Sequence, residues 1–172
     1  MFFKHLNLNY NKNKLIKEFH SFNFIPYAIT QTELEQDHSY FTEDYKPNSW
    51  FDKSNTWLIH RVRKFDNAPE ILKLYNMLTS KLGRIRTSIF KQKSGTELPF
   101  HSDYKKVRCA VNIILSDESA PIIFEEYGEL EYKCALLNIT KRHKVPAFHK
   151  ERMLLKFNIF ETEFEKAKDL LN

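Results

Sequence analysis

From Gly83 onward the sequence changes to short segments with a period of two, and this feature most limits what the chain can fold into. Such alternation predicts short strands whose side chains point to opposite faces of a sheet. Turn signals separate the segments at Ser94 and Gly95, at 117–119 and at Gly128. The predicted strands are 84–91, 107–115, 121–126, 130–133, 135–140 and 152–160. Short strands with tight connections predict an antiparallel sandwich or barrel, not a parallel α/β sheet.

Before Gly83 the pattern predicts two helices and one strand. Residues 13–22 carry apolar side chains at helical spacing, namely Leu15, Ile16, Phe19 and Phe22. Residues 67–82 form the clearer helix, with Asn67 as a suitable N-cap, Pro69 in the first turn and Gly83 as the C-terminal stop. Residues 56–62 alternate like a strand, and 163–171 predict a short amphipathic helix.

The length of 172 residues predicts one domain over 1–172. We divide it into an N-terminal helical and loop region at 1–83, a β core at 84–160 and a C-terminal helix at 163–171. Hydrophobic residues make up 42% of the chain and aromatics 15%, which is enough for a large core. The fold class is therefore mainly β, within the α+β group.

The charge pattern bears on the class of partner. Lys and Arg number 27 against 22 Asp and Glu, and the excess of +5 is spread along the chain. A nucleic-acid binder more often carries a basic stripe with interleaved aromatics, so we expect a small-molecule or peptide substrate instead. No apolar run reaches the length of a membrane span, and the N-terminus lacks an apolar signal region. Together with two cysteines inside apolar runs, Cys109 and Cys134, this predicts a cytoplasmic protein with no membrane contact.

Two histidines and one aspartate form the most informative motif. Seven histidines occur, and a single histidine on a sheet is usually a satisfied polar group. His101 differs because Asp103 follows two residues later, and on an extended segment these side chains point to the same side. His143 supplies a second imidazole. Two imidazoles and one carboxylate form the facial triad that binds non-haem iron(II), so His101, Asp103 and His143 are the predicted metal ligands and the catalytic centre.

A basic residue follows the second histidine at the head of the final predicted strand. With Arg152 in this place, residues 86–160 resemble the 2-oxoglutarate- and iron(II)-dependent dioxygenases. The resemblance implies a double-stranded β-helix core, of the jelly-roll or cupin type, with the N-terminal helices packed on one sheet. It also implies Fe(II) as cofactor, 2-oxoglutarate bound through Arg152 as cosubstrate, O2 as oxidant, and a hydroxylation that releases succinate and CO2.

The alternation of the final strand agrees with this interpretation. Four side chains share one face, namely Arg152, Leu154, Lys156 and Asn158. The other face is apolar and suited to packing on the N-terminal helices. A strand that points Arg, Lys and Asn into a barrel is typical of a site, since guanidinium forks bind carboxylates with two hydrogen bonds. The alternative is a solvated face on which Arg152 makes a surface ion pair.

A finer resemblance concerns the aspartyl/asparaginyl β-hydroxylase-like branch, which includes proline cis-hydroxylases. Residues 94–101 resemble the turn before that branch's first metal histidine, and 108–115 resemble its next strand. On that match Asn112 and Arg108 are predicted to bind the cosubstrate, and the substrate is an amino acid or a residue within a peptide. Two departures are Ser94 in place of the turn proline and Asn112 where some members carry histidine.

Several alternatives remain open. His149 could replace His143, but it lies close to Arg152 in the chain. The nucleic-acid demethylase branch has a second arginine where this chain has Asn158, which argues against a nucleic-acid hydroxylase. A cupin-like module that binds a metal or small acid without oxidising it is the rival from another class.

A long polar and aromatic stretch at 30–54 predicts a loop that could form a lid or a wall of the binding site. Five side chains could line the substrate pocket, although packing or exposure explains each equally well: Tyr40, Tyr45, Trp50, His60 and Arg61.

Overall fold

Antiparallel pairing joins most of the described chain into two sheets. The computed structural model describes residues 1–26, 57–103 and 106–172. The predicted loop at 30–54, with Tyr40, Tyr45 and Trp50, lies outside the described residues. Its part in substrate binding therefore stays a prediction.

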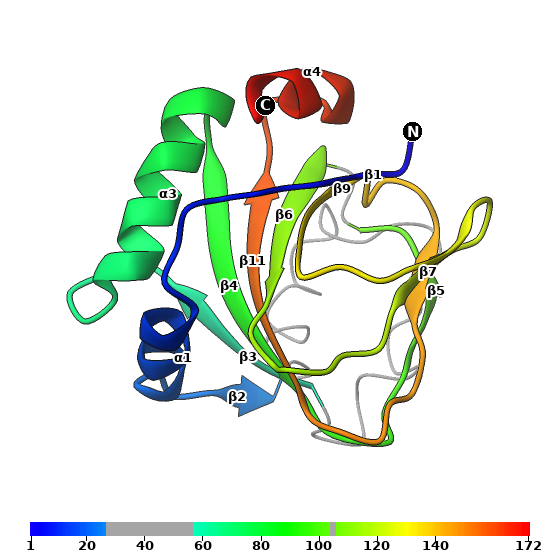
Figure 1. The fold of residues 1–172 in the computed structure, drawn as a ribbon, viewed down its shortest axis with the longest axis horizontal. Helices are drawn as coiled ribbons and strands as arrows, with labels where there is room; N and C mark the ends of the chain where they lie inside the picture. Colours follow the sequence, from blue (N-terminus) through cyan, green and yellow to red (C-terminus); the bar gives the residue numbers. More distant parts are fainter. Residues whose placement is uncertain (27–56, 104–105) are drawn as a thin grey trace, which may run out of the picture.

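Within the described ranges the large sheet has seven strands in the order β1-β9-β6-β11-β4-β3-β2, and the small sheet has four in the order β5-β10-β7-β8. The strands of the large sheet are β1 (Phe3–His5), β2 (Ile25–Pro26), β3 (Trp57–Val62), β4 (Ile85–Gln92), β6 (Cys109–Ile114), β9 (Cys134–Leu137) and β11 (Arg152–Ile159). Those of the small sheet are β5 (Leu98–His101), β7 (Ile122–Phe124), β8 (Gly128–Leu130) and β10 (His143–Val145). The small sheet faces the large sheet on the side away from α1 and α3 (Figure 1).

The central strand β11 has two different faces. It pairs with β4 on one side and β6 on the other, both antiparallel. Leu155, Phe157 and Ile159 are fully buried in the core on the helix side. Leu154, between Arg152 and Lys156, packs instead in the core between the sheets. The alternation predicted for this strand is confirmed, and the face with Arg152 is not solvated, because Arg152 is 3% exposed.

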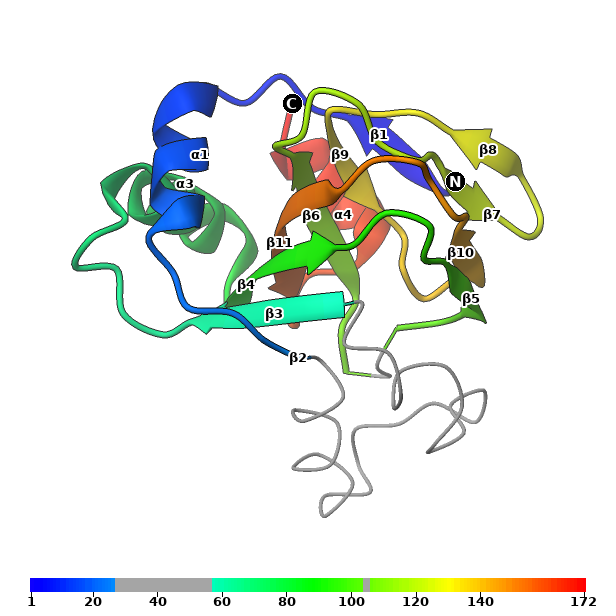
Figure 2. The same cartoon turned by 90° about the horizontal axis from the view of Figure 1, so that it is seen from below.

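Helices α1 (Lys12–His20) and α3 (Pro69–Leu82) cover the outer face of the large sheet. Helix α4 (Phe164–Leu170) closes one end of it (Figures 1 and 2). Leu74, Leu78 and Leu82 of α3 are almost completely buried there, which follows from their spacing along one helical face. Gly83 ends α3 with a positive φ of 80°, as predicted.

The predicted N-cap of α3 is wrong. The capping position is Ala68, which makes no side-chain hydrogen bond, and Asn67 lies outside the cap. The carboxylate of Glu18 on α1 accepts hydrogen bonds from the backbone N–H of Glu70 at 2.7 Å and of Ile71 at 2.9 Å. The Glu70 carboxylate in turn accepts from the backbone N–H of Asn11, at 2.9 Å, just before α1. Each helix therefore supplies an acceptor to the N-terminus of the other.

Two apolar cores result, one between the helices and the large sheet and one between the two sheets. This is the mainly β jelly-roll architecture that was predicted. Cys109 and Cys134 are free and buried, and burial raises the pKa of each thiol to about 12. In the described ranges no helix has both the length and the apolar character required to cross a membrane.

Candidate metal centre

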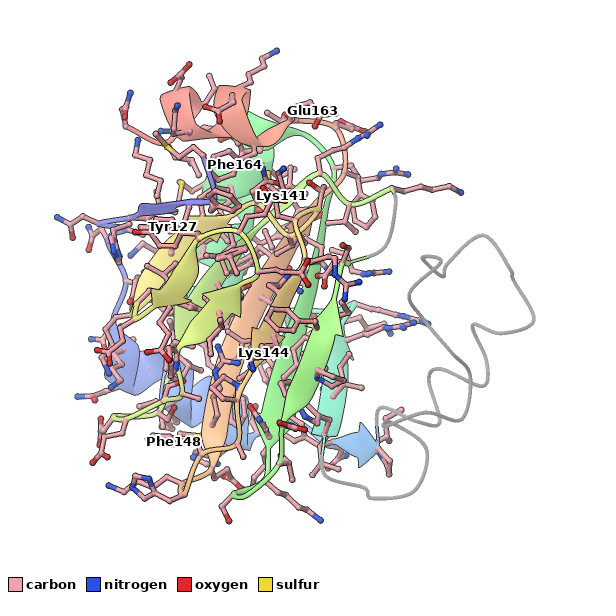
Figure 3. All side chains as sticks on the ribbon, turned by 90° about the vertical axis from the view of Figure 1, so that its right-hand side faces the viewer. Tyr127, Lys141, Lys144, Phe148, Glu163 and Phe164 are labelled. Atoms are coloured by element: carbon pink, nitrogen blue, oxygen red, sulfur yellow. The ribbon has the colours of Figure 1, made fainter. Side chains whose placement is uncertain are left out.

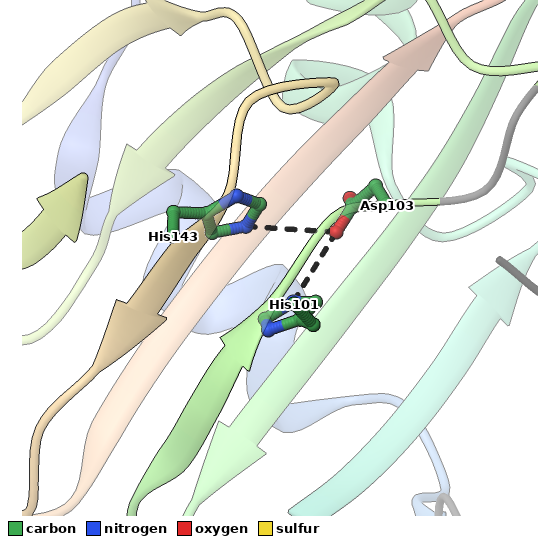
Figure 4. Close-up of side chains that lie close together, drawn as sticks. All are labelled: His101, Asp103 and His143. Atoms are coloured by element: carbon green, nitrogen blue, oxygen red, sulfur yellow. Dashed lines mark ion pairs between the residues drawn. The ribbon is translucent and has the colours of Figure 1, made fainter. Parts of the chain in front are cut away.

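Strand pairing brings the two predicted metal histidines together. His101 ends β5, His143 begins β10, and the two residues lie directly opposite each other in the small sheet. Asp103 follows β5 by two residues, and its carboxylate reaches the same space. One ligand atom from each residue lies within 4.8 Å of the others. Asp103 Oδ1 is 3.4 Å from His101 Nε2 and 3.6 Å from His143 Nε2 (Figure 4).

The alternation of the small sheet decides which side chains face inward. Lys144, next to His143 on β10, lies on the outer side of the small sheet (Figure 3). Its ammonium is 4.9 Å from the centre of the Phe100 ring. Phe100 and Lys144 thus share one face, while His101 and His143 share the other with their rings 4.5 Å apart. A shift of one residue in either strand would remove its histidine from the cluster.

Each histidine is held by a local backbone hydrogen bond. His101 Nδ1 lies 2.7 Å from the carbonyl oxygen of Pro99, and His143 Nδ1 lies 2.8 Å from that of Lys141. A carbonyl only accepts, so Nδ1 is the protonated nitrogen that donates in both rings. Nε2 then carries the lone pair on the side of Asp103. This is the arrangement in which a metal-binding imidazole is usually fixed by its surroundings.

The protonation states also suit a cation. Burial lowers the pKa of His143 to about 3, so its ring is neutral near pH 7. Burial alone would raise the pKa of Asp103. The ammonium of Lys156, with the two histidines, outweighs this effect and holds the pKa well below its ordinary value. The cluster therefore offers one carboxylate and a neutral imidazole, which are the forms that bind a metal ion.

Lys156 makes a contact that the sequence did not reveal. Its Nζ is 2.5 Å from Asp103 Oδ2, whereas Oδ1 faces the two histidines. The two carboxylate oxygens thus have different partners. Lys156 points inward from β11 because it alternates with the apolar residues on the helix side.

A second polar cluster lies on the same inner surface. Arg152 Nη2 donates to the hydroxyl of Tyr132 at 2.9 Å, and Asn112 Nδ2 donates to the same oxygen at 3.1 Å. Arg152 Nε and Asn112 Oδ1 are buried without a hydrogen-bond partner. Across the described ranges no Asp or Glu forms an ion pair with Arg152. A buried guanidinium without a counter-charge is costly unless an anion binds there.

The two clusters are linked through strands β11 and β6. Arg152 and Lys156 are on the same face of β11, and a rise of about 3.3 Å per residue separates them by roughly 13 Å along the strand. Asn112 pairs directly with Lys156 in the sheet register and also contacts Tyr132, so it connects the two clusters.

Other predicted residues lie elsewhere. Arg108 is not brought to the cluster: it precedes β6, its side chain is 47% exposed, and it pairs with Glu163 at 3.2 Å. His149 is also at the surface, 3.8 Å from Glu118. His60 stacks on Phe22 and contacts the Asn23 carbonyl oxygen, so it faces the helix side.

Tyr132 was missed by the sequence prediction, which treated 130–133 as a strand without a chemical role. The observed strand β8 instead spans Gly128–Leu130. The sequence signal for Tyr132 was its alternation in phase with Leu130, which places both side chains on one face of the predicted strand 130–133.

The donor set fits a divalent first-row metal. Two imidazole nitrogens and one carboxylate oxygen are borderline and hard ligands, and this combination suits iron(II). Three protein ligands leave coordination positions for further groups. The buried polar atoms without a hydrogen-bond partner, Arg152 Nε and Asn112 Oδ1, fit the binding of a carboxylate-bearing molecule between the sheets.

Two solved structures share this fold. One is a viral collagen prolyl hydroxylase from Paramecium bursaria Chlorella virus-1 in complex with 2-oxoglutarate, with a TM-score of 0.58 and 8% identity over 95% of this chain and 97% of that chain. The other is a prolyl-4-hydroxylase from Pseudomonas putida, with a TM-score of 0.58 and 11% identity over 92% of this chain and 91% of that chain. The sequence matches no protein-family model and no curated protein. The likeness confirms the fold that the resemblance implied.

Proposed function

We propose that this chain is a non-haem iron(II)- and 2-oxoglutarate-dependent oxygenase that hydroxylates an amino acid or a residue within a peptide. The observation that carries the proposal is a His-Asp-His cluster and a buried arginine on the inner side of a jelly roll, and no Asp or Glu of the described residues forms an ion pair with that arginine. The resemblance of residues 86–160 to this family of dioxygenases supports it independently of the geometry.

His101, Asp103 and His143 would hold the metal. Iron(II), with 2-oxoglutarate and dioxygen bound, supplies the oxidising power for hydroxylation of an unactivated C–H bond. The protein's part is to keep the imidazoles in one tautomer through the carbonyls of Pro99 and Lys141. Lys156 holds the Oδ2 atom of Asp103 and so directs Oδ1 toward the histidines.

Arg152 would bind the distal carboxylate of 2-oxoglutarate. Its fork offers two parallel N–H groups, and the low exposure of 3% strengthens the pairing with an anion. Tyr132 already accepts hydrogen bonds from Arg152 and Asn112, so its own O–H is available to donate to the same carboxylate. Apolar side chains of the core between the sheets, among them Leu154 and Ile114, keep water from the Arg152 end of the site.

The decisive experiment combines metal binding with turnover. Anaerobic addition of iron(II) and 2-oxoglutarate should give a weak visible charge-transfer band, and admission of air should convert 2-oxoglutarate to succinate. His101→Ala and His143→Ala should each weaken manganese(II) binding by more than about 100-fold, beyond the loss typical of an outer-sphere partner. His149→Ala is the matched control, because this histidine is on the surface.

Arg152→Met separates the two ligands. We expect it to weaken 2-oxoglutarate binding by about 2–5 kcal/mol, the usual loss for one partner of a buried charge pair, and to leave manganese(II) affinity unchanged. Unaltered metal binding in both histidine variants would overturn the site. Iron binding by the wild type without any consumption of 2-oxoglutarate would instead favour the cupin-like binding module.

A further inference from the structure

The inner face of the large sheet carries two arginines that the proposed reaction does not use, Arg86 on β4 and Arg61 on β3. Arg86 lies over the Phe160 ring, 5.4 Å from its centre. Arg61 on β3 lies opposite Ser88 of β4 in the sheet register, and Ser88 lies opposite Lys156 of β11. Arg61, Ser88 and Lys156 therefore form one row across three strands. At about 4.8 Å between neighbouring strands, Arg61 is roughly 10 Å from the strand that carries Lys156.

The orientation of Arg61 follows from its neighbours on β3. Trp57 alternates in phase with Arg61 and contacts the Phe90 ring, which packs on the core between the sheets. Val62, in the opposite phase, packs in the helix-side core. Arg61 thus shares the inner face with Trp57, whereas His60 is turned outward. The sequence alone could not separate Arg61 from His60 as a pocket residue.

The charges on this inner face do not balance. Strands β3, β4, β6, β9 and β11 contain no Asp or Glu. Lys156 is neutralised by Asp103, and in the proposed function Arg152 is neutralised by the cosubstrate. Arg61 is half-buried and, throughout the described ranges, has neither an ion-pair nor a hydrogen-bond partner. A guanidinium in this setting binds an oxyanion in preference to any neutral group.

A second polar group faces the same space. Asn158 is one row further along β11, opposite Arg86 of β4 and Ala110 of β6. It is 7% exposed, and its Oδ1 atom has no hydrogen-bond partner. An unpaired buried amide oxygen calls for a donor from a ligand or from water. Arg61 and Asn158 therefore offer one anion-binding fork and one acceptor on the inner face of the large sheet.

We propose that Arg61 binds an oxyanion group of the substrate, a carboxylate or a phosphate, and that the substrate is therefore anionic. This inference rests on the proposed function for the place of the substrate, but the anion site itself belongs to β3. Asn158 accepts a hydrogen bond from an N–H or O–H of the same molecule. A neutral apolar substrate would leave both groups buried against it without a partner.

The test uses two simple anions as probes. Protein loaded with manganese(II) and saturating 2-oxoglutarate is titrated with acetate or with inorganic phosphate, at ionic strength held constant with chloride. The thermal midpoint should rise saturably with the preferred anion, because a ligand that binds only the folded state stabilises it. Arg61→Met should weaken this apparent affinity at least tenfold, and Arg61→Lys should retain part of it.

Lys166→Met is the control for loss of one positive charge, because Lys166 is exposed on α4. It should leave the anion titration unchanged. Unchanged manganese(II) affinity in the Arg61 variants shows that they are folded. The proposal is overturned if neither anion stabilises the wild type, or if wild type and Arg61→Met respond equally. A difference between acetate and phosphate identifies the charged group of the substrate.

Failure of the proposed function gives a different result. In that case the wild type does not bind manganese(II) or does not take up 2-oxoglutarate. The anion titration is then repeated without either ligand on Arg152→Met, which removes Arg152 as a competing anion site. If the double variant Arg61→Met/Arg152→Met loses the anion-dependent rise in thermal midpoint, the anion site is still assigned to Arg61. If the double variant responds as Arg152→Met does, the assignment is wrong.

Discussion

At the scale of single residues, the hydroxyl group of Tyr132 is the most constrained polar group of the site. Two buried donors, Arg152 and Asn112, both point at its hydroxyl oxygen. Their convergence leaves the tyrosine proton directed away from both. The hydroxyl thus fixes the guanidinium in place and adds a donor of its own for an incoming carboxylate.

We predict that Tyr132→Phe weakens 2-oxoglutarate binding roughly tenfold to a hundredfold, because a hydrogen bond to a charged group contributes about 1.5–3 kcal/mol. Manganese(II) affinity should not change, since the hydrogen bonds of Tyr132 in the described ranges join it to Arg152 and Asn112 and not to His101, Asp103 or His143. Calorimetric titration of both ligands measures the two effects. Tyr127→Phe, at an exposed tyrosine, serves as the control, and equal losses in the two variants would refute the role of Tyr132.

How far the sequence reveals the site depends on the range of each contact. His101 and Asp103 are predictable because their shared direction follows from local backbone geometry. Their convergence with His143 is confirmed, but it depends on the pairing of β5 with β10. The inward direction of Lys156 was predicted, but its contact with Asp103 and the position of Tyr132 were not, since no local rule states what an inward-pointing side chain will meet between the sheets.

At the scale of elements, α1 and α3 depend on each other. Glu18 caps α3 and Glu70 accepts from the backbone before α1. A carboxylate at a helix N-terminus satisfies N–H groups that have no partner within the helix, and it also interacts favourably with the helix dipole. The sequence predicted both helices correctly from their apolar spacing. It could not predict these caps, because the acceptor comes from a distant segment.

Glu18→Ala should lower the free energy of unfolding by about 2 kcal/mol, the upper range for loss of a helix cap. Two buried N–H groups then lose their acceptor. Urea denaturation followed by circular dichroism measures the change. Glu129→Ala, exposed on β8, should have almost no effect, and similar midpoints for the two variants would contradict the capping role.

Glu70 should make the free energy of unfolding depend on pH in the acid range. The backbone N–H of Asn11, helped by Lys73, lowers the pKa of Glu70 below its ordinary value of 4.5. A carboxylate whose pKa is lower in the folded state stabilises the fold at pH values above its unfolded-state pKa. This stabilisation is lost as the pH falls through the folded-state pKa. Glu70→Gln should therefore flatten the decline of stability below about pH 4.5, as measured by urea midpoints at several pH values. A parallel decline in both proteins would refute this assignment.

Short strands were the least predictable elements. Strand β10 has three residues, His143–Val145, too few for a period to be recognised. It forms through pairing with β5 on one side and β7 on the other. The terminal strand β1, with residues Phe3–His5, likewise forms by pairing with β9. Long strands such as β11 were predicted because their alternation extends over eight residues.

At the scale of the whole molecule, the large sheet separates two cores with different tasks. On one side it packs on α1 and α3, with a continuous apolar surface. On the other side apolar residues share the space with the polar groups of the site. Unpaired buried atoms such as Arg152 Nε and Asn158 Oδ1 reduce stability. The helix-side core offsets this cost.

Leu78→Ala tests this separation. Leu78 is 0% exposed in the helix-side core, so removal of its side chain should cost about 2–5 kcal/mol of unfolding free energy. The folded protein should still bind manganese(II) with unchanged affinity, because the sheet lies between Leu78 and the metal cluster. Denaturation and metal titration are measured on the same preparation, and a large loss of metal affinity in the folded state would show that the two cores are coupled.

The alternation along β11 has a practical consequence for altering this protein. Leu155, Phe157 and Ile159 pack the strand against the helix-side core, while Lys156 and Asn158, which alternate with them, face the space between the two sheets. A library that varies Asn158 on β11 and Arg61 on β3 would explore new substrates without touching the helix-side packing. Changes at Leu155, Phe157 and Ile159 should reduce the yield of folded protein, whereas changes at Asn158 should leave the helix-side core intact.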